Sequence, residues 1–178
     1  MTRALESNVT LVLTHVSAEL AQAHDELYPE RVEEHIPLSL TLLYPWMSPP
    51  EITEDDLEGL RKFFAGRPPL EFSLTRIDEF PGAVVYAVPE PDEELRALMR
   101  ALWERYPDFP PYGRPGSEPP PHCTLGRLEG PTPTTLEGVK ERVEPLLPVH
   151  CDVREASLLE EYELDRMRLR ETFPLGGA

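Results

Sequence analysis

The sequence predicts an α+β fold, in which helices alternate with antiparallel pairs of strands. Two strand pairs are joined by short turns, at Pro81-Gly82 and at residues 162–165, and such hairpins connect antiparallel strands. Alternating helices and strands would also suit a doubly wound parallel sheet. That alternative is disfavoured because the chain has two hairpins and because no glycine-rich phosphate loop follows a strand.

In the first part of the chain, capping residues and apolar spacing define the elements. Ser17 and Thr53 are suitable N-caps for helices that end near Leu27 and Gly66. His24, in the first of these helices, is expected at the helix surface or boundary. The charged residues 30–34 are expected to form a loop. Strands are expected where apolar residues alternate with other residues, at 8–16, 37–46, 70–74 and 83–88.

In the second part, Pro91 is expected to open a helix that ends near Tyr106. Thr134 and Glu137 have the spacing of a capping box, which predicts another helix after them. A strand is expected at the second of two related motifs, described below, followed by a long strand at 148–160 and its hairpin partner at 166–173.

Composition favours a small ligand over a long nucleic acid. The net charge is −16, and binding of duplex nucleic acid rests largely on phosphate neutralisation by Lys and Arg. No apolar run approaches the roughly 20 residues that a membrane-spanning helix needs, and the N-terminus lacks the apolar core of a secretion signal. We therefore expect a cytoplasmic protein that binds no membrane, and we expect it to be a monomer.

The cysteine content predicts neither a disulfide framework nor a metal centre. There are only two cysteines, Cys123 and Cys151, and no other residues show the spacing of metal ligands. Cys123 is expected to be a small buried apolar residue. We therefore expect no metal and no cofactor.

Two segments resemble each other and are the strongest functional pattern in the chain. Residues 37–46 read PLSLTLLYPW, and residues 119–127 read PPPHCTLGR. Side chains alternate between the two faces of a strand. His122 and Thr124 should therefore share one face, as should Ser39 and Thr41. Two such strands side by side would direct two short polar pairs into one cleft.

These segments, and the order of elements around them, resemble the 2H phosphoesterase superfamily, in particular its bacterial 2′-5′ RNA ligase-like branch. That family carries a His-apolar-Thr/Ser motif in each half of a pseudo-symmetric fold. The second motif, beginning at His122, fits fully, whereas the first has Ser39 where the family has histidine. The resemblance covers about residues 8–173. It implies one domain, 1–178, with two antiparallel-rich lobes and flanking helices around a central cleft.

The resemblance also implies a reaction: cleavage or formation of ribose phosphodiesters with a 2′ linkage, including 2′,3′-cyclic phosphates. Such chemistry needs one group to accept a proton and another to donate one, and two imidazoles can share these tasks. Hydroxyls can stabilise the phosphoryl oxygens as charge develops. The expected catalytic residues are therefore His122, Thr124, Thr41 and Ser39, and the expected ligand is a small nucleotide or a short oligonucleotide phosphodiester.

Ser39 leaves three alternatives, because a serine hydroxyl does not ionise near neutral pH. His15 or His35, both upstream of the first motif, could supply the missing imidazole. Ser39 could instead support weakened chemistry, with water or the substrate handling one proton. Finally, the protein could be a catalytically inactive module that binds nucleotides or phosphate esters.

Further candidates lie near the motifs. Residues 107–121 include seven prolines and are expected to form either a semi-rigid rim over the cleft or a stiff surface connector. As a rim, this loop would offer Tyr112 and Arg114 to a substrate. Arg127 would reach the cleft if a β-bulge shifts its parity after Gly126. Tyr44, from its parity with Thr41, is expected to face the core side unless the strand has ended before it.

Overall fold

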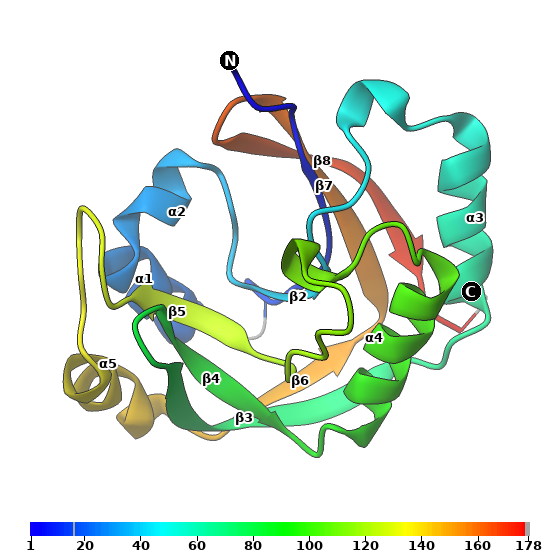
Figure 1. Ribbon diagram of the computed structural model, residues 1–178. Coiled ribbons are helices and arrows are strands. Elements are labelled where there is room, and N and C mark those ends of the chain that lie inside the picture. The colour runs from blue at the N-terminus through cyan, green and yellow to red at the C-terminus, as the bar shows by residue number, and fades with distance from the viewer. Residues whose placement is uncertain (16, 177–178) are drawn as a thin grey trace.

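The computed structural model describes residues 1–15 and 17–176 and shows a strongly curved antiparallel sheet of eight strands (Figure 1). The strands are β1 (Ser7–Val12), β2 (Ser39–Leu43), β3 (Leu70–Phe80), β4 (Val84–Glu90), β5 (Cys123–Arg127), β6 (Val149–Val153), β7 (Glu155–Glu163) and β8 (Arg166–Pro174). The helices are α1 (Ala18–Leu27), α2 (Pro29–Glu33), α3 (Glu54–Ala65), α4 (Glu93–Arg105) and α5 (Leu136–Val143). Short 3₁₀ turns occur at Pro49–Glu51, Pro111–Gly113 and Glu144–Leu146.

The order of the strands divides the sheet into two related halves. The order is β6-β3-β4-β5-β2-β1-β7-β8, and every pairing in it is antiparallel. Four strands lie on each side of the boundary between β5 and β2, the two strands that carry the motifs. This arrangement confirms the predicted α+β class with two antiparallel halves. The halves interleave along the sequence, since β1 pairs with the C-terminal strand β7 and so places β1 and β2 in the same half as β7 and β8.

The segment expected as one strand at 148–160 is two strands, so that prediction was wrong. β6 lies at one edge of the sheet and β7 lies next to the other edge, yet Arg154 alone joins them. A single residue can connect such distant positions only if the sheet curls until its ends approach each other. The backbone N–H of Leu175, just after β8, donates to the Arg154 carbonyl at 2.9 Å and holds this junction.

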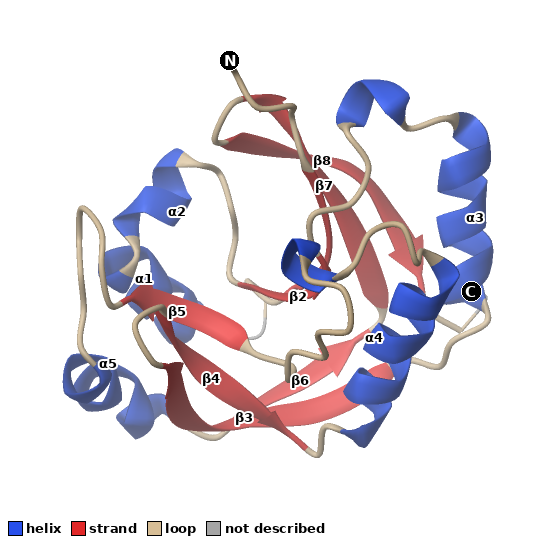
Figure 2. Cartoon of the chain, viewed as in Figure 1, coloured by secondary structure: helices blue, strands red, loops and turns tan. Residues whose placement is uncertain are grey.

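The helices lie at the flanks of the curved sheet and leave part of its concave face free (Figure 2). Helix α3 packs on β8, where Phe64 stacks on Phe173 with ring centroids 5.7 Å apart. Helix α4 packs on β2, and the indole N–H of Trp103 donates to the Leu42 carbonyl at 2.9 Å. On the other flank, α1 contacts β5 and α5 contacts β3. The motif strands are thereby fixed from outside by helices of both halves.

Several element boundaries differ from the sequence prediction. The first strand ends at Val12 rather than at residue 16, which lies outside the described residues. Residues 30–34 are mostly helical, because Pro29 at the first helical position starts the short helix α2. The cap of α5 is Thr135, whose hydroxyl accepts from the Gly138 N–H. Thr134 is not the cap. Its backbone N–H donates to the Arg127 carbonyl and closes the loop that precedes the helix.

Candidate active site

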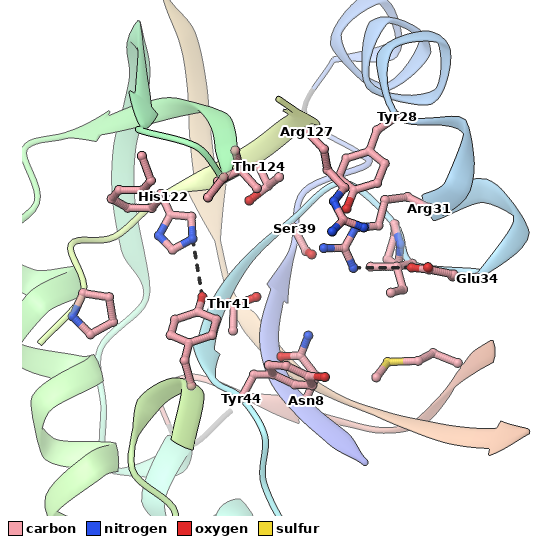
Figure 3. Close-up of a pocket in the computed structure, with 18 of the residues that line it drawn as sticks. Asn8, Tyr28, Arg31, Glu34, Ser39, Thr41, Tyr44, His122, Thr124 and Arg127 are labelled. Atoms are coloured by element: carbon pink, nitrogen blue, oxygen red, sulfur yellow. Dashed lines mark hydrogen bonds and ion pairs between the residues drawn. The ribbon is translucent and has the colours of Figure 1, made fainter. Parts of the chain in front are cut away.

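The concave face of the sheet carries a cavity of about 790 Å³ that both halves line. This volume lies in the range of small-molecule sites. Figure 3 shows its polar side chains, with His122 at one end, Arg31 and Tyr28 at the other, and Ser39, Thr41 and Thr124 between them. The predicted site residues all line this one cavity: Ser39, Thr41, Tyr112, Arg114, His122, Thr124 and Arg127.

The pairing of β2 with β5 brings the two motifs together. Leu40 lies opposite Cys123 in an antiparallel register, and both side chains are fully buried on the convex side. Their neighbours therefore point to the concave side, where the register sets Ser39 beside Thr124 and Thr41 beside His122. The two short polar pairs expected from the sequence thus form one cluster.

His122 is held in a defined orientation. Its Nδ1 lies 2.8 Å from the Pro120 carbonyl, which can only accept, so Nδ1 carries the proton in the neutral ring. Nε2 is then free to accept and lies 3.4 Å from the Tyr112 hydroxyl. The ring packs edge-on against Phe80 at 4.9 Å between centroids. Burial lowers the pKa of His122, so the ring is neutral at neutral pH.

The proline-rich segment is a rim of the cavity, as one of the two readings of the sequence expected. The N–H of Tyr112 donates to the Tyr44 carbonyl at 2.7 Å, which ties the segment to the end of β2. Tyr112 adopts a left-handed backbone conformation with φ 53°, and its ring lies 6.3 Å from that of His122. Loss of hydration raises the pKa of Tyr112 to about 12. Its hydroxyl is therefore a neutral hydrogen-bond donor to the cavity.

Arg127 reaches the cavity through a β-bulge. In the pairing of β4 with β5, Val85 lies opposite Gly126 and Tyr86 opposite Thr124, so β5 has one extra residue. The extra residue shifts the parity of Arg127 and returns it to the concave side. The sequence predicted that Arg127 would reach the cleft if a β-bulge shifted its parity, and β5 contains such a bulge.

The end of the cavity near Ser39 is rich in guanidinium groups. Figure 3 shows Arg127, Arg31 and Tyr28 gathered beside Ser39. The Arg31 guanidinium lies 4.8 Å from the centre of the Tyr28 ring, and one of its nitrogens lies 3.7 Å from a Glu34 carboxylate oxygen. In a chain with net charge −16, this local positive charge favours an anionic ligand.

Three cavity residues were missed or misplaced by the sequence analysis. Tyr44 lines the cavity instead of facing the core side, because β2 ends at Leu43 and the chain then turns. Its hydroxyl donates to the Glu6 carboxylate. Asn8 is buried and lines the cavity, and its Oδ1 has no partner among the described residues. In β1, adjacent side chains point to opposite faces of the strand, so Asn8 lies on the face opposite to that of the buried Val9. This alternation could have identified Asn8 as a cavity residue.

The third such residue is His24, expected at the surface or boundary of its helix. It is 3% exposed and lines the cavity, and its Nδ1 lies 3.1 Å from an Asp25 carboxylate oxygen. By contrast, neither His15 nor His35 lines it, so the geometry does not support the alternative in which one of them supplies the missing imidazole. His15 is exposed, and His35 is engaged with the Tyr162 hydroxyl at 3.2 Å.

The two buried histidines should make the protein less stable in mild acid. Burial lowers the pKa of both His24 and His122 in the folded chain. As the pH falls through about 6.5, the unfolded chain therefore binds more protons than the folded chain. We expect the free energy of unfolding, measured in urea, to decrease between about pH 7.5 and pH 5.5. A double glutamine variant at these positions should lose most of this dependence, and an unchanged dependence would contradict the assignment.

The described residues show neither a metal-binding cluster nor a helix that could span a membrane. Residues 1–15 and 17–176 contain no group of three His, Cys, Asp or Glu side chains arranged to hold a metal ion. Within the same residues, no helix has the length and apolar character required to cross a membrane.

Comparison with known proteins places the fold and the family. Solved structures that resemble this chain include one described as a phosphoesterase (17% identity, TM-score 0.59, 97% of this chain and 99% of that chain). Others are TT0787 of Thermus thermophilus (22% identity, TM-score 0.58, 97% and 98%) and E. coli LigT complexed with 3′-AMP (15% identity, TM-score 0.58, 97% and 99%). At these identities the likeness concerns the fold alone. No curated protein matches the chain. Residues 12–165, however, match the family described as the 2′-5′ RNA ligase superfamily, and the chain belongs to this superfamily.

Proposed function

We propose that the protein is a metal-independent phosphoesterase that acts on small ribose phosphodiesters carrying a 2′,3′-cyclic phosphate or a 2′-5′ linkage. The observation that carries the proposal is the single cluster formed by His122, Thr124 and Thr41 on the concave face. The imidazole can transfer a proton, and the two hydroxyls beside it can stabilise the phosphoryl oxygens, so the cluster supplies part of what phosphodiester chemistry requires. Membership of the superfamily supports the same reaction class.

In the proposed reaction the phosphate lies over the two motif strands. Nε2 of the neutral His122 accepts a proton from the attacking water or hydroxyl. The hydroxyls of Thr41 and Thr124 donate hydrogen bonds to the phosphoryl oxygens as negative charge develops. Arg127 lies near the Ser39 end, where its charge favours the anionic substrate.

The size and charge of the cavity suit a nucleotide rather than a polymer. Its volume of about 790 Å³ accommodates a mononucleotide or a short oligonucleotide, and the guanidinium groups of Arg31 and Arg127 gather near Ser39. Structures of E. coli LigT were determined with 3′-AMP, ATP, NADP+ and phosphate, which supports a small nucleotide as the ligand class. We further propose that the protein acts in the cytoplasm as a monomer without a cofactor.

Ser39 supports a second candidate function. The family resemblance places a histidine at this position, and a hydroxyl cannot transfer protons near neutral pH as an imidazole does. Losing one positioned acid or base lowers a rate by on the order of 10² to 10⁴. A cavity that keeps His122 and both threonines could then serve to bind nucleotides or phosphate esters without turning them over.

An assay of the wild-type protein separates the two candidates. Four 2′,3′-cyclic mononucleotides and a 2′-5′-linked diadenylate are each incubated with the protein, and the products are resolved by chromatography. We expect ring opening or cleavage that persists in excess EDTA. Absence of turnover, together with binding of 3′-AMP in calorimetry, would favour the binding module. Absence of both turnover and binding would overturn both candidates.

A further inference from the structure

The cavity contains a second imidazole that neither motif supplies. We propose that His24 is the second acid–base residue of the site and performs the proton transfer that Ser39 cannot. This inference rests on the proposed phosphodiester reaction and adds a catalytic residue to it. His24 thus takes the role that the sequence analysis considered for His15 or His35, which lie outside the cavity.

Helix α1 brings His24 to the motif strands. The helix packs against β5. Near its end, the Leu27 carbonyl comes within 3.7 Å of the position that a Cβ on Gly126 would occupy. His24 lies three residues before Leu27 and lines the cavity with the motif residues. The absence of a side chain at Gly126 therefore lets the helix that carries this histidine approach the second motif closely.

The neighbours of His24 place it at the Ser39 end of the cavity. Its ring centroid lies 6.3 Å from that of Tyr28, and the Arg31 guanidinium is close enough to disfavour its protonated form. Both neighbours stand beside Ser39 in Figure 3, whereas His122 lies at the opposite end. His24 therefore lines the part of the cavity near Tyr28 and Arg31, and the proposal sets the bound phosphate between this imidazole and that of His122.

The hydrogen bonds of His24 are those of an oriented imidazole. Its Nδ1 pairs with the Asp25 carboxylate at 3.1 Å, which fixes the proton on Nδ1 and favours the imidazolium when a proton arrives. Nε2 has no hydrogen-bond partner among the described side chains and backbone groups. A core histidine would be satisfied on both sides, whereas a catalytic one keeps one nitrogen for the substrate.

The assignment gives a balanced reaction for a 2′,3′-cyclic nucleotide. Water attacks phosphorus and loses its proton to Nε2 of the neutral His122. A new P–O bond forms to the water oxygen, and the bond from phosphorus to one ribose oxygen breaks. His24, which is neutral at rest, takes up a proton from solvent to form an imidazolium that its hydrogen bond to Asp25 stabilises, and this imidazolium delivers the proton to the departing oxygen. The two histidines exchange roles if the reaction runs in reverse.

A substitution series tests the proposal. His24→Gln preserves polarity and approximate size but cannot transfer a proton, and the matched control is His15→Gln at an exposed position outside the cavity. With 2′,3′-cyclic AMP as substrate, we expect His24→Gln to lower kcat at least about tenfold while KM changes less than about threefold. His15→Gln should behave as the wild type does. Circular dichroism and thermal melting establish that both variants are folded.

Asp25→Asn provides a second route to the same answer. The Asp25 side chain is 60% exposed, so the substitution should not disturb folding. We expect Asp25→Asn to lower kcat by a smaller factor than His24→Gln does. An active wild type whose kcat is unchanged in both variants would overturn the role of His24 while leaving the proposed function intact. A wild type without turnover would overturn both.

Discussion

Replacing His122 by glutamine should lower kcat on 2′,3′-cyclic nucleotides by on the order of 10² to 10⁴. The glutamine amide can still donate to the Pro120 carbonyl, which His122 contacts at 2.8 Å, so the local fold should be kept. It cannot accept a proton from the attacking water at neutral pH. In the proposed reaction the threonine hydroxyls and Arg127 hold the substrate phosphate, so we expect KM to change little.

The control for this variant is His150→Gln. His150 is exposed on β6, outside the cavity, and its replacement should leave kcat unchanged. Both proteins are compared in steady-state assays after their thermal melts have been matched. If His122→Gln retained more than about a third of wild-type kcat, His122 would not be the general base, and the proposed reaction would need another residue.

Introducing histidine at position 39 should raise turnover, by up to on the order of 10² to 10⁴ in a background that lacks another second imidazole. The antiparallel pairing of Leu40 with Cys123 sets residue 39 beside Thr124, so the new ring would flank the phosphate opposite His122. In the wild-type background the gain should be smaller, because His24 already performs this transfer. We therefore expect Ser39→His to rescue the His24→Gln variant.

Ser39→Asn is the matched control, since it adds polar bulk at the same position without a group that titrates near neutrality. Initial rates are measured for Ser39→His and Ser39→Asn, each alone and combined with His24→Gln. Rescue by histidine and not by asparagine would show that proton transfer limits the variant. Equal rates for histidine and asparagine would mean that the shape of the cavity, rather than its acid–base content, controls turnover.

Local patterns in the sequence predicted the motif strands well. Alternation alone placed Ser39 and Thr41 on one face and His122 and Thr124 on another, because the period of two in a strand does not depend on the rest of the fold. That these two faces form one cavity followed from the resemblance to a known family. No local rule dictates that β2 and β5 become neighbours when about 80 residues separate them.

What the sequence did not reveal depends on tertiary packing. His24 looked like a surface residue of a helix, and only the docking of α1 against β5 shows that it lines the cavity. Tyr44 changed sides because β2 ends at Leu43, three residues before the predicted end of the strand, and element ends are the least certain part of a prediction from sequence. The junction at Arg154 was hidden because residues on both of its sides favour strands, so composition gives no indication of the break.

The pairing of Ser7 with Glu160 in β1 and β7 has a consequence for how the molecule reaches its native state. Contacts between residues so distant along the chain are slow to form, because the intervening loop must first lose its conformational freedom. During synthesis β1 leaves the ribosome early, whereas its partner strand β7 is synthesised near the end of the chain. The cavity therefore cannot exist in the nascent chain until its last strands have left the ribosome, and an exposed strand edge must meanwhile be kept from pairing with other chains.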